Sequence, residues 1–322
     1  NTQPINIIIQ QLKSASETSL AAVKPSTSEI LDFSCTHTLN SGIFASLPIT
    51  ATVDANGAGN LTIGSTTYTV HQDPTTSGGI TCARLYDDLE SFLTCSVPVP
   101  VSLSLTPADS QNRTSCFKDI SGLSLYRAYG AIVAQQGKGS AAPASSSSRS
   151  QTSSSSSSNT CSNKINTTLV GDGNPHQNYL NKQLSPNTNC TTTPCTLPSA
   201  SPNSPSYSTT INWTSSATAA HWTSGGFPVT QSWTTPPSGN NHSCSGGAGD
   251  TVCLWYSTAH TAYTVQNEGV GSDGCAGDGG KGLSNSQFVM FSPNKDNKGG
   301  GGYYCAVGFC GGLGGEWWDY GG

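Results

Sequence analysis

Residues 80–105 read ITCARLYDDLESFLTCSVPVPVSLSL, and this stretch decides how we interpret the first part of the chain. It predicts two strands that meet near Asp87 and Asp88, because apolar and β-branched runs bounded by turn residues are typical of a hairpin. A second hairpin is predicted just before it. Residues 59–72, GNLTIGSTTYTVHQ, alternate apolar and polar positions on both sides of Gly64 and Ser65.

The N-terminal stretch predicts a different element. In TQPINIIIQQLKSASETSLAAV, residues 2–23, four apolar side chains follow the spacing of one helical face and come after a proline suited to a first turn: Ile5, Ile8, Ile9 and Leu12. We expect an amphipathic helix here, with an edge strand through INIII as the alternative. Residues 1–140 are therefore predicted to form a small α+β or mostly β domain.

A serine-rich segment follows, and it predicts a linker. ASSSSRSQTSSSSSSNTC, residues 144–161, offers no apolar side chains that could offset the chain entropy lost on ordering. We assign residues 141–160 to an extended, O-glycosylated connector. A flexible tether of this kind holds two domains at high local concentration on a shared target.

Residues 161–322 lack long helical periodicity. They contain aromatic and β-branched segments bounded by glycine and proline: SYSTTINWTSSA, GFPVTQSWTT, VCLWYSTAHTAYTVQ and QFVMFSP. Their spacing predicts an all-β sandwich or barrel. The fold class predicted for the whole chain is thus mostly β.

The twelve cysteines divide evenly around the linker and predict disulfides within each half. The first half holds Cys35, Cys82, Cys95 and Cys116, and the second holds Cys161, Cys190, Cys195, Cys244, Cys253, Cys275, Cys305 and Cys310. Their pairing stays open. So many disulfides indicate an oxidising compartment, so we expect a secreted, extracellular or cell-wall protein.

Acceptor motifs for N-linked glycans point to the same compartment. The N-x-S/T motifs begin at Asn60, Asn112, Asn166, Asn189, Asn212 and Asn241. We expect several of them to carry glycans at exposed positions. The chain begins at Asn1, from which we expect that a signal peptide has been removed. The longest apolar run is far shorter than the about 20 residues of a membrane helix, so no membrane span is predicted.

Charge is sparse, with 13 basic against 18 acidic side chains. This balance repels nucleic acid unless a local basic patch exists, and the second half has few lysines from which to build one. We therefore exclude nucleic acid as a partner.

Several segments resemble secreted, cysteine-rich proteins of filamentous fungi. In the second half these are VGDGNPHQNYLNKQLS, SGGFPVTQSWTT, GAGDTVCLWYSTAHTAYTVQN and GGGGYYCAVGFC. In the first half, NSGIFASLPITATV and SGGITCARLYDDLESFLTC are similar to the companion domain of such proteins. The resemblance implies origin and secretion, and it assigns no catalytic residue.

Carboxylates are the first candidates for chemistry, because glycoside hydrolysis needs two of them. Glu316 and Asp319 flank two tryptophans in GGEWWDYGG, where an indole could raise the pKa of a general acid. The alternative is a tail packed on the surface. Asp172 lies between two glycines and Asp250 follows one, positions where an Asx turn is the common structure. The sharper hypothesis pairs one of these two acids with His176 in a cleft.

No metal or cofactor is predicted. The histidines form no H-x-H, HExxH or Cys-x-x-Cys/His grouping, and the cysteines are better assigned to disulfides. An α/β-hydrolase is excluded because no G-x-S-x-G motif occurs.

Aromatic side chains are the stronger signal in the second half. Six tryptophans lie there, and indole faces commonly stack on sugar rings. We expect about half of them to form the core of a small β domain. Trp317, Trp318 and Trp222 remain as candidates for ligand binding, together with His176.

The leading hypothesis is a secreted fungal glycoprotein that binds cell-wall glycans, with glycoside hydrolysis as a further hypothesis. The expected partner is an extracellular polysaccharide. A non-enzymatic, self-associating coat or matrix protein is the main alternative, because charge-poor strands with open edges suit lateral assembly. A secreted effector or toxin is the second alternative.

Overall fold

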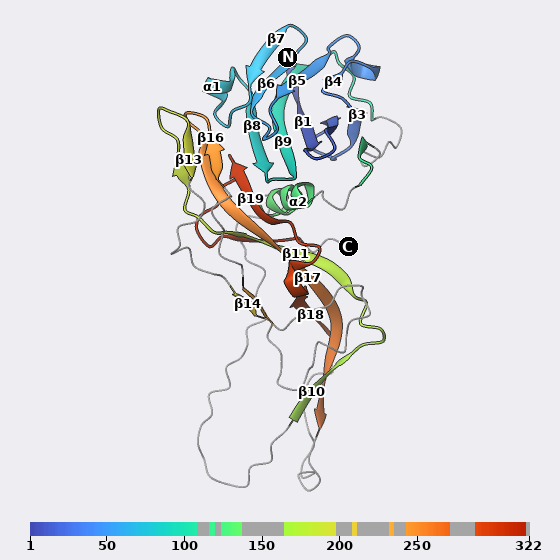
Figure 1. Cartoon of the computed structure of the whole chain (residues 1–322). Coiled ribbons are helices and arrows are strands. Elements are labelled where there is room, and N and C mark those ends of the chain that lie inside the picture. Colours follow the sequence, from blue (N-terminus) through green and yellow to red (C-terminus); the bar gives the residue numbers. More distant parts are fainter. Residues whose placement is uncertain are drawn as a thin grey trace.

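The computed structural model describes residues 1–107, 116–119, 124–136, 164–197, 208–210, 232–234, 243–270 and 287–319. The fold is mostly β, as predicted, and most strands join one antiparallel sheet of twelve strands. Figure 1 shows an elongated molecule, with the first half at one end and the long strand of the second half reaching the other.

The described residues of the first half form nine strands. Five of them belong to the large sheet: β1 (Thr2–Leu12), β2 (Glu17–Val23), β3 (Ile30–Ser34), β8 (Thr81–Tyr86) and β9 (Glu90–Pro100). The other four form a separate sheet in chain order: β4 (Thr38–Leu39), β5 (Ile49–Val53), β6 (Gly59–Ile63) and β7 (Thr66–Thr69). Short helical segments in the described residues are η1 (Gly42–Phe44) and α1 (Pro74–Ser77) in this half and η5 (Lys295–Asn297) in the second half.

The predicted N-terminal helix is wrong, because its residues form β1 and β2. Strand β1 also lies inside the sheet, between β9 and β2, and not at an edge. Ile5, Ile7 and Ile9 enter one core and Ile8 enters another on the opposite face. A strand buried on both faces carries a continuous apolar run, and such a run also contains the spacing of a helical face.

Both predicted hairpins are present. Strands β6 and β7 pair with Ile63 opposite Thr66, so Gly64 and Ser65 form the two-residue turn. Gly64 has a φ of 58°, which glycine adopts at little cost and which suits a tight hairpin turn. Strands β8 and β9 pair on either side of Asp87 and Asp88, with Tyr86 opposite Ser91.

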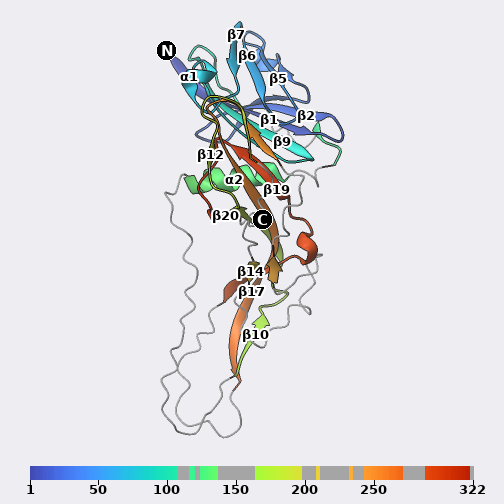
Figure 2. The ribbon, with the colours of Figure 1, turned by 60° about the vertical axis from the view of Figure 1, so that its left-hand side comes forward.

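The small sheet packs on one face of the large sheet and encloses the main core of the first half. Alternate residues of β1, β2 and β9 meet alternate residues of β5 and β6 there. The buried side chains include Ile7, Leu20, Val97, Ile49 and Leu61. The outer face of the small sheet is left to solvent, and Figure 2 shows this sheet lying over β1 and β9.

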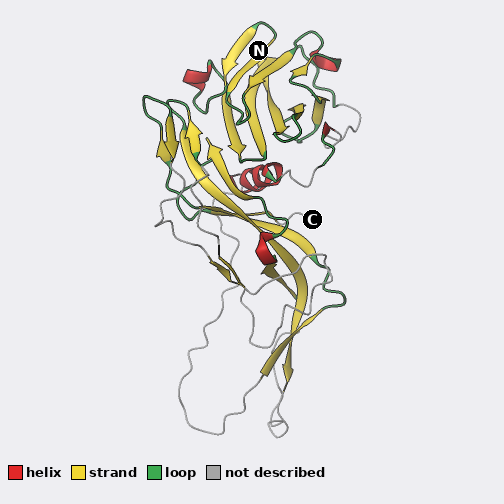
Figure 3. Ribbon diagram, viewed as in Figure 1, coloured by secondary structure: helices red, strands yellow, loops and turns green. Residues whose placement is uncertain are grey.

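The second half contains the other strands, whose bounds are as follows: β10 (Lys164–Leu169), β11 (His176–Gln183), β12 (Thr188–Asn189), β13 (Cys195–Leu197), β14 (Ser208–Thr210), β15 (Ser232–Thr234), β16 (Cys244–Gly246), β17 (Thr251–Val270), β18 (Phe288–Pro293), β19 (Gly302–Val307) and β20 (Glu316–Asp319). The described part of this half is all-β, in agreement with the sequence. Figure 3 shows how little helix the described residues contain.

Strand β17 organises the second half. Its β-branched and aromatic residues favour extended backbone over 20 positions. Along one edge of β17, β12, β11 and β10 pair with successive parts of the strand. Along its other edge, β19 and β18 pair with it in the same way. Two further two-stranded sheets, β13–β16 and β14–β15, lie outside this sheet.

One strand pair joins the two halves. Strand β19 pairs with β8, with Cys305 opposite Tyr86 and Val307 opposite Arg84. The large sheet therefore runs across the predicted boundary at residues 141–160, which themselves lie outside the described residues. The division into two domains stays a prediction, whereas the described halves are connected by backbone hydrogen bonds.

Helix α2 (Leu125–Gln136) covers the opposite face of the large sheet from β4–β7, close to the junction of the halves. Leu125 and Ala128 pack against Phe92, Trp255 and Tyr304. The buried carboxylate of Glu90 caps this helix, because it accepts hydrogen bonds from the backbone nitrogens of Ser124 and Leu125. Side chains of both halves thus share one core beneath α2.

Each described disulfide joins cysteines of the same half. The bonds are Cys35–Cys116, Cys82–Cys95, Cys190–Cys195, Cys244–Cys305 and Cys253–Cys310. Cys161 and Cys275 lie outside the described residues. This disulfide content is consistent with an oxidising compartment. Among the described helices, none has the length and apolarity needed to cross a bilayer.

Candidate functional site

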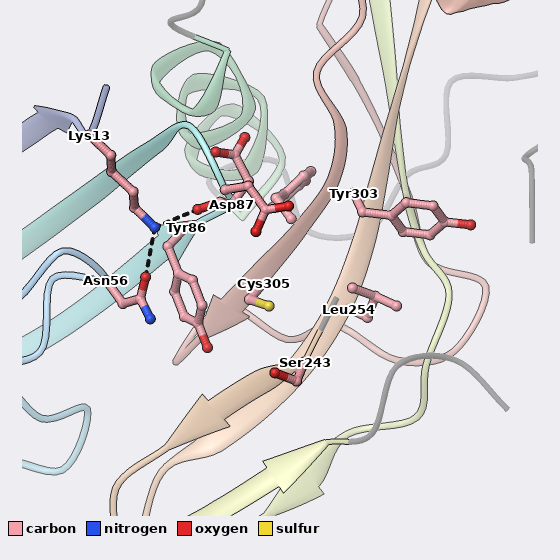
Figure 4. A pocket seen from close by; sticks show the side chains of 10 residues that line it. Lys13, Asn56, Tyr86, Asp87, Ser243, Leu254, Tyr303 and Cys305 are labelled. Carbon is pink, nitrogen blue, oxygen red and sulfur yellow. Dashed lines mark hydrogen bonds between the residues drawn. The ribbon is translucent and has the colours of Figure 1, made fainter. Parts of the chain in front are cut away.

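A pocket of about 190 Å³ lies where the two halves meet. The turn between β8 and β9 lines one side of it, and strands β17 and β19 line the other. Figure 4 shows Lys13, Asn56 and Tyr86 coming from the first half and Ser243, Leu254 and Tyr303 from the second. The site therefore exists only because β8 and β19 are paired.

The first-half side of the pocket is polar and held in place. The ammonium group of Lys13 donates to Oδ1 of Asn56 at 2.7 Å and to the carbonyl oxygen of Asp87 at 2.5 Å. Burial lowers the pKa of Lys13, while the charges of Asp87 and Asp88 act to raise it. An ammonium group has three protons, so one remains for a ligand beyond these two contacts.

Aromatic rings supply the apolar part of the pocket. Lys13 lies over the ring of Tyr86 at 5.8 Å, and Tyr303 meets Tyr256 edge-on with ring centroids 4.8 Å apart. Burial, together with Tyr256, raises the pKa of Tyr303 to about 12. Its phenol therefore keeps its proton near neutral pH.

The acidic residues near the pocket mainly serve the backbone. Oδ1 of Asp87 accepts hydrogen bonds from the backbone nitrogens of Leu89 and Glu90, both at 2.7 Å. Burial raises the pKa of Asp87, and burial also raises the pKa of Glu90 to about 7. Glu90 is fully buried beneath α2 and does not line the pocket. Asp88 is the exposed carboxylate at the pocket rim.

Asp250, a predicted catalytic acid, is buried in a polar cluster near the pocket. Its Oδ1 lies 3.3 Å from Nε2 of His71, and its Oδ2 accepts from the backbone nitrogen of Gly247 at 2.9 Å. Arg84 lies 4.0 Å from the same carboxylate. Gly249 has a φ of 87°, and a Cβ there would lie 3.2 Å from the His71 ring. The cluster therefore joins the halves, and Asp250 is closed off from solvent.

Asp172 and His176 meet at one turn, but through the backbone of Asn174. Oδ1 of Asp172 accepts from the nitrogen of Asn174 at 2.9 Å, which is an Asx turn. Nδ1 of His176 lies 2.9 Å from the carbonyl oxygen of Asn174. Asp250 belongs to the His71 cluster instead, so these residues do not form one cleft.

Glu316 and Asp319 lie on β20 but on opposite faces of the strand, because side chains alternate along it. Glu316 is exposed and pairs with Lys182 at 2.5 Å. Trp317 stacks on the buried Trp255 with ring centroids 3.8 Å apart. Trp318 lies on the other face, beside His260 and Phe291. The four predicted acids are thus spread over three places.

Several predicted residues lie outside the described residues: Trp222, Asn112, Asn212 and Asn241. Asn166 lies in β10. Asn60 and Asn189 are exposed, in β6 and β12. Within the described residues, no group of three or more His, Cys, Asp or Glu side chains is placed to hold a metal ion.

No family model, curated protein or solved structure matches this chain. The resemblance to secreted fungal proteins therefore stays a prediction.

The sequence pointed to Asp87 and Asp88 only as a turn and did not select Lys13, Asn56 or Tyr303. The pocket residues come from segments far apart in the chain. A turn with two carboxylates beside a tyrosine, YDDLE at residues 86–90, was the one local signal that could have drawn attention to the site.

Proposed function

We propose that the protein binds extracellular glycans and that the pocket at the junction takes one sugar unit. The observation that carries this proposal is the mixture of tyrosine rings with an ammonium group, an amide and a carboxylate around one small pocket. Sugar sites combine an aromatic surface for the apolar face of the ring with polar groups for its hydroxyls.

The size of the pocket limits the ligand. At about 190 Å³ it is smaller than the ~300–1,000 Å³ of pockets that bury drug-sized molecules. A single sugar at the end of a chain, or a side branch, suits this volume.

Binding has more support than hydrolysis. Of the two acids that line the pocket, Asp87 accepts hydrogen bonds from the turn backbone, and the acids predicted from sequence lie in separate places. Glycoside hydrolysis needs two carboxylates about 5–9.5 Å apart across the scissile bond. We derive no catalytic step from these groups.

The self-assembly alternative has less support. The main strand order of the described sheet ends at β3 and β20, and both are short strands. Glu316 and Lys182 form an ion pair at the β20 edge, and charged side chains on a short edge strand oppose pairing with another chain.

The test is binding of a panel of soluble oligosaccharides and insoluble wall polysaccharides to the full chain, measured by calorimetry and by pull-down. Lys13→Met and Asn56→Ala should each weaken binding about tenfold, because each removes a hydrogen-bonding group from the pocket. Lys295→Met is the matched control, since Lys295 is exposed on η5 outside the pocket. Equal affinities for all three variants would refute the assignment of the pocket.

A further inference from the structure

The outer face of the small sheet carries a regular array of hydroxyl groups. We call it the threonine face, and its members are Thr38, Thr50, Thr52, Asn60, Thr62, Thr67 and Thr69. Their inward neighbours, such as Ile49, Ala51, Leu61 and Ile63, enter the core. Side chains alternate along strands, so the members of the array point outward together.

The register aligns these residues in two rows. Thr38 pairs with Thr50, Thr50 with Thr62, and Thr62 with Thr67. Thr52, Asn60 and Thr69 form the second row in the same way. Neighbours in a row lie about 4.8 Å apart, and the rows are about 7 Å apart along the strands.

The face is uncharged and presents donors and acceptors. None of the strands β4–β7 contains an Asp, Glu, Lys or Arg. The hydroxyls of Thr62 and Thr67 are bonded at 3.0 Å, and those of Thr38 and Thr50 lie 3.4 Å apart. Hydroxyl and methyl groups on one surface match the chemistry of a sugar ring.

Asn60 lies in the middle of this array and begins the motif Asn60-Leu61-Thr62. Asn60 and Thr62 point to the same outer face, because they are two residues apart in β6. The Asn60 side chain is exposed and makes no hydrogen bond within the described residues. Any glycan attached there starts at the centre of the threonine face.

We propose that Asn60 carries an N-linked glycan whose first sugars lie on the threonine face and hydrogen-bond to its hydroxyls. The donor is a lipid pyrophosphate-linked oligosaccharide in the secretory pathway. The amide nitrogen forms a bond to the anomeric carbon, the bond from that carbon to the pyrophosphate breaks, and one amide proton is released. The glycan then covers the outer face of the small sheet.

The proposal is independent of ligand binding at the junction pocket. None of the pocket-lining residues belongs to the threonine face. A failure of one assignment therefore leaves the other unaffected. The inference does depend on passage of the chain through a glycosylating compartment.

The first experiment measures occupancy on the full chain secreted from a eukaryotic host. Treatment with a peptide N-glycosidase in heavy-oxygen water converts a modified Asn60 into a labelled aspartate, which peptide mass spectrometry detects. Labelling at Asn60 supports the proposal, and its loss in Asn60→Gln confirms the site. An unlabelled Asn60 overturns it.

The second experiment tests whether the glycan lies on the face. The rate at which an endoglycosidase cuts the glycan from the native protein is compared between the wild type and the double variant Thr52→Val, Thr69→Val. We expect release to be about tenfold faster in the variant, since both hydroxyls beside Asn60 are gone. Equal rates mean that the glycan extends into solvent and overturn this part of the proposal.

Two controls make the comparison specific. Thr66→Val changes an exposed residue of the same strand β7 whose side chain is on the other side from Thr67 and Thr69, so its rate should equal that of the wild type. Denatured samples of all variants should release the glycan at one common rate.

A different result would contradict the proposal. If the protein with an unmodified Asn60 binds insoluble polysaccharide and Thr67→Lys abolishes this binding, the threonine face is a docking surface and the proposal is wrong.

Discussion

Nε2 of His71, from the first half of the chain, lies 3.3 Å from Oδ1 of Asp250, from the second half. Both side chains are almost completely buried. Gln72, next to His71, makes two hydrogen bonds to Thr251. Nε2 of Gln72 donates to Oγ1 of Thr251, and Oε1 of Gln72 accepts from the backbone nitrogen of Thr251. These polar contacts fix the halves in register beside the β8–β19 pair, and the junction pocket depends on that register.

Asp250→Asn should destabilise the protein by about 1–3 kcal/mol, because it removes a buried charge from between His71 and Arg84 and turns an amide donor toward them. Denaturant unfolding measures the change. Asp172→Asn is the matched control, since asparagine also supports the Asx turn at Asn174, and it should shift stability by less than about 0.5 kcal/mol. Equal effects of the two substitutions would argue against a structural role for the cluster.

Glu90 predicts a pH dependence with a definite sign. Its pKa is about 7 in the folded protein against an ordinary 4.5, chiefly because burial disfavours the charged form. The stabilisation from the neutral carboxyl is complete below pH 4.5 and is lost as pH rises through 7, by up to about 3 kcal/mol. Glu90→Gln should remove this slope while keeping an acceptor for the Ser124 and Leu125 nitrogens.

His260 contributes the opposite slope, so Glu90 has to be measured as a difference between wild type and variant. Burial lowers the pKa of His260 to about 4, so its contribution is present above the ordinary value of 6.5 and is lost as pH falls through 4. The difference in unfolding free energy between wild type and Glu90→Gln, followed from pH 4 to pH 8, isolates Glu90. A difference that does not vary with pH would show that Glu90 does not titrate in this range.

Thr261→Val tests a closed polar network beside β17. The Gln177 amide donates to Oγ1 of Thr261 at 2.9 Å, and that hydroxyl donates to Oδ1 of Asn294 at 2.8 Å. Nδ2 of Asn294 in turn donates a hydrogen bond to Oε1 of Gln177 at 2.7 Å, which closes the network. Valine keeps the shape but leaves a donor and an acceptor unpaired, so we expect a loss of about 1–3 kcal/mol by thermal unfolding. An unchanged stability of Thr261→Val would mean that a water molecule replaces the hydroxyl in the network.

Trp317→Ala should act on stability and not on ligand binding. Its ring stacks on Trp255, which is buried in the core beneath α2. Losing this contact should cost about 2–4 kcal/mol of unfolding free energy. Oligosaccharide affinity per folded molecule should stay unchanged, because Trp317 does not line the junction pocket. If a folded and stable Trp317→Ala protein lost its affinity for oligosaccharides, the ligand site would lie at β20, as the sequence predicts.

The candidate site was far less predictable than the strands. Lys13 lies within the segment for which the sequence predicts a helix, and Tyr303 lies in β19, more than half the chain away from Tyr86. No local pattern relates such residues, because only the pairing of β8 with β19 brings them together. The four candidate acids, Glu316, Asp319, Asp250 and Asp172, stand out only because of the glycines and tryptophans next to them in the sequence. Those neighbours do not determine which acids lie close together in the fold.

By itself, the sequence determined the features that depend on neighbouring residues. The hairpins at Gly64 and at Asp87, the high β content and the formation of disulfides all follow from turn chemistry, strand propensity and cysteine number. Tertiary structure alone decided that β1 is a strand, because Ile7 and Ile8 are each stabilised by a different core, one on each face of the sheet. It also decided that Asp250 is buried beside His71, since this burial depends on contacts between segments that are distant in the chain.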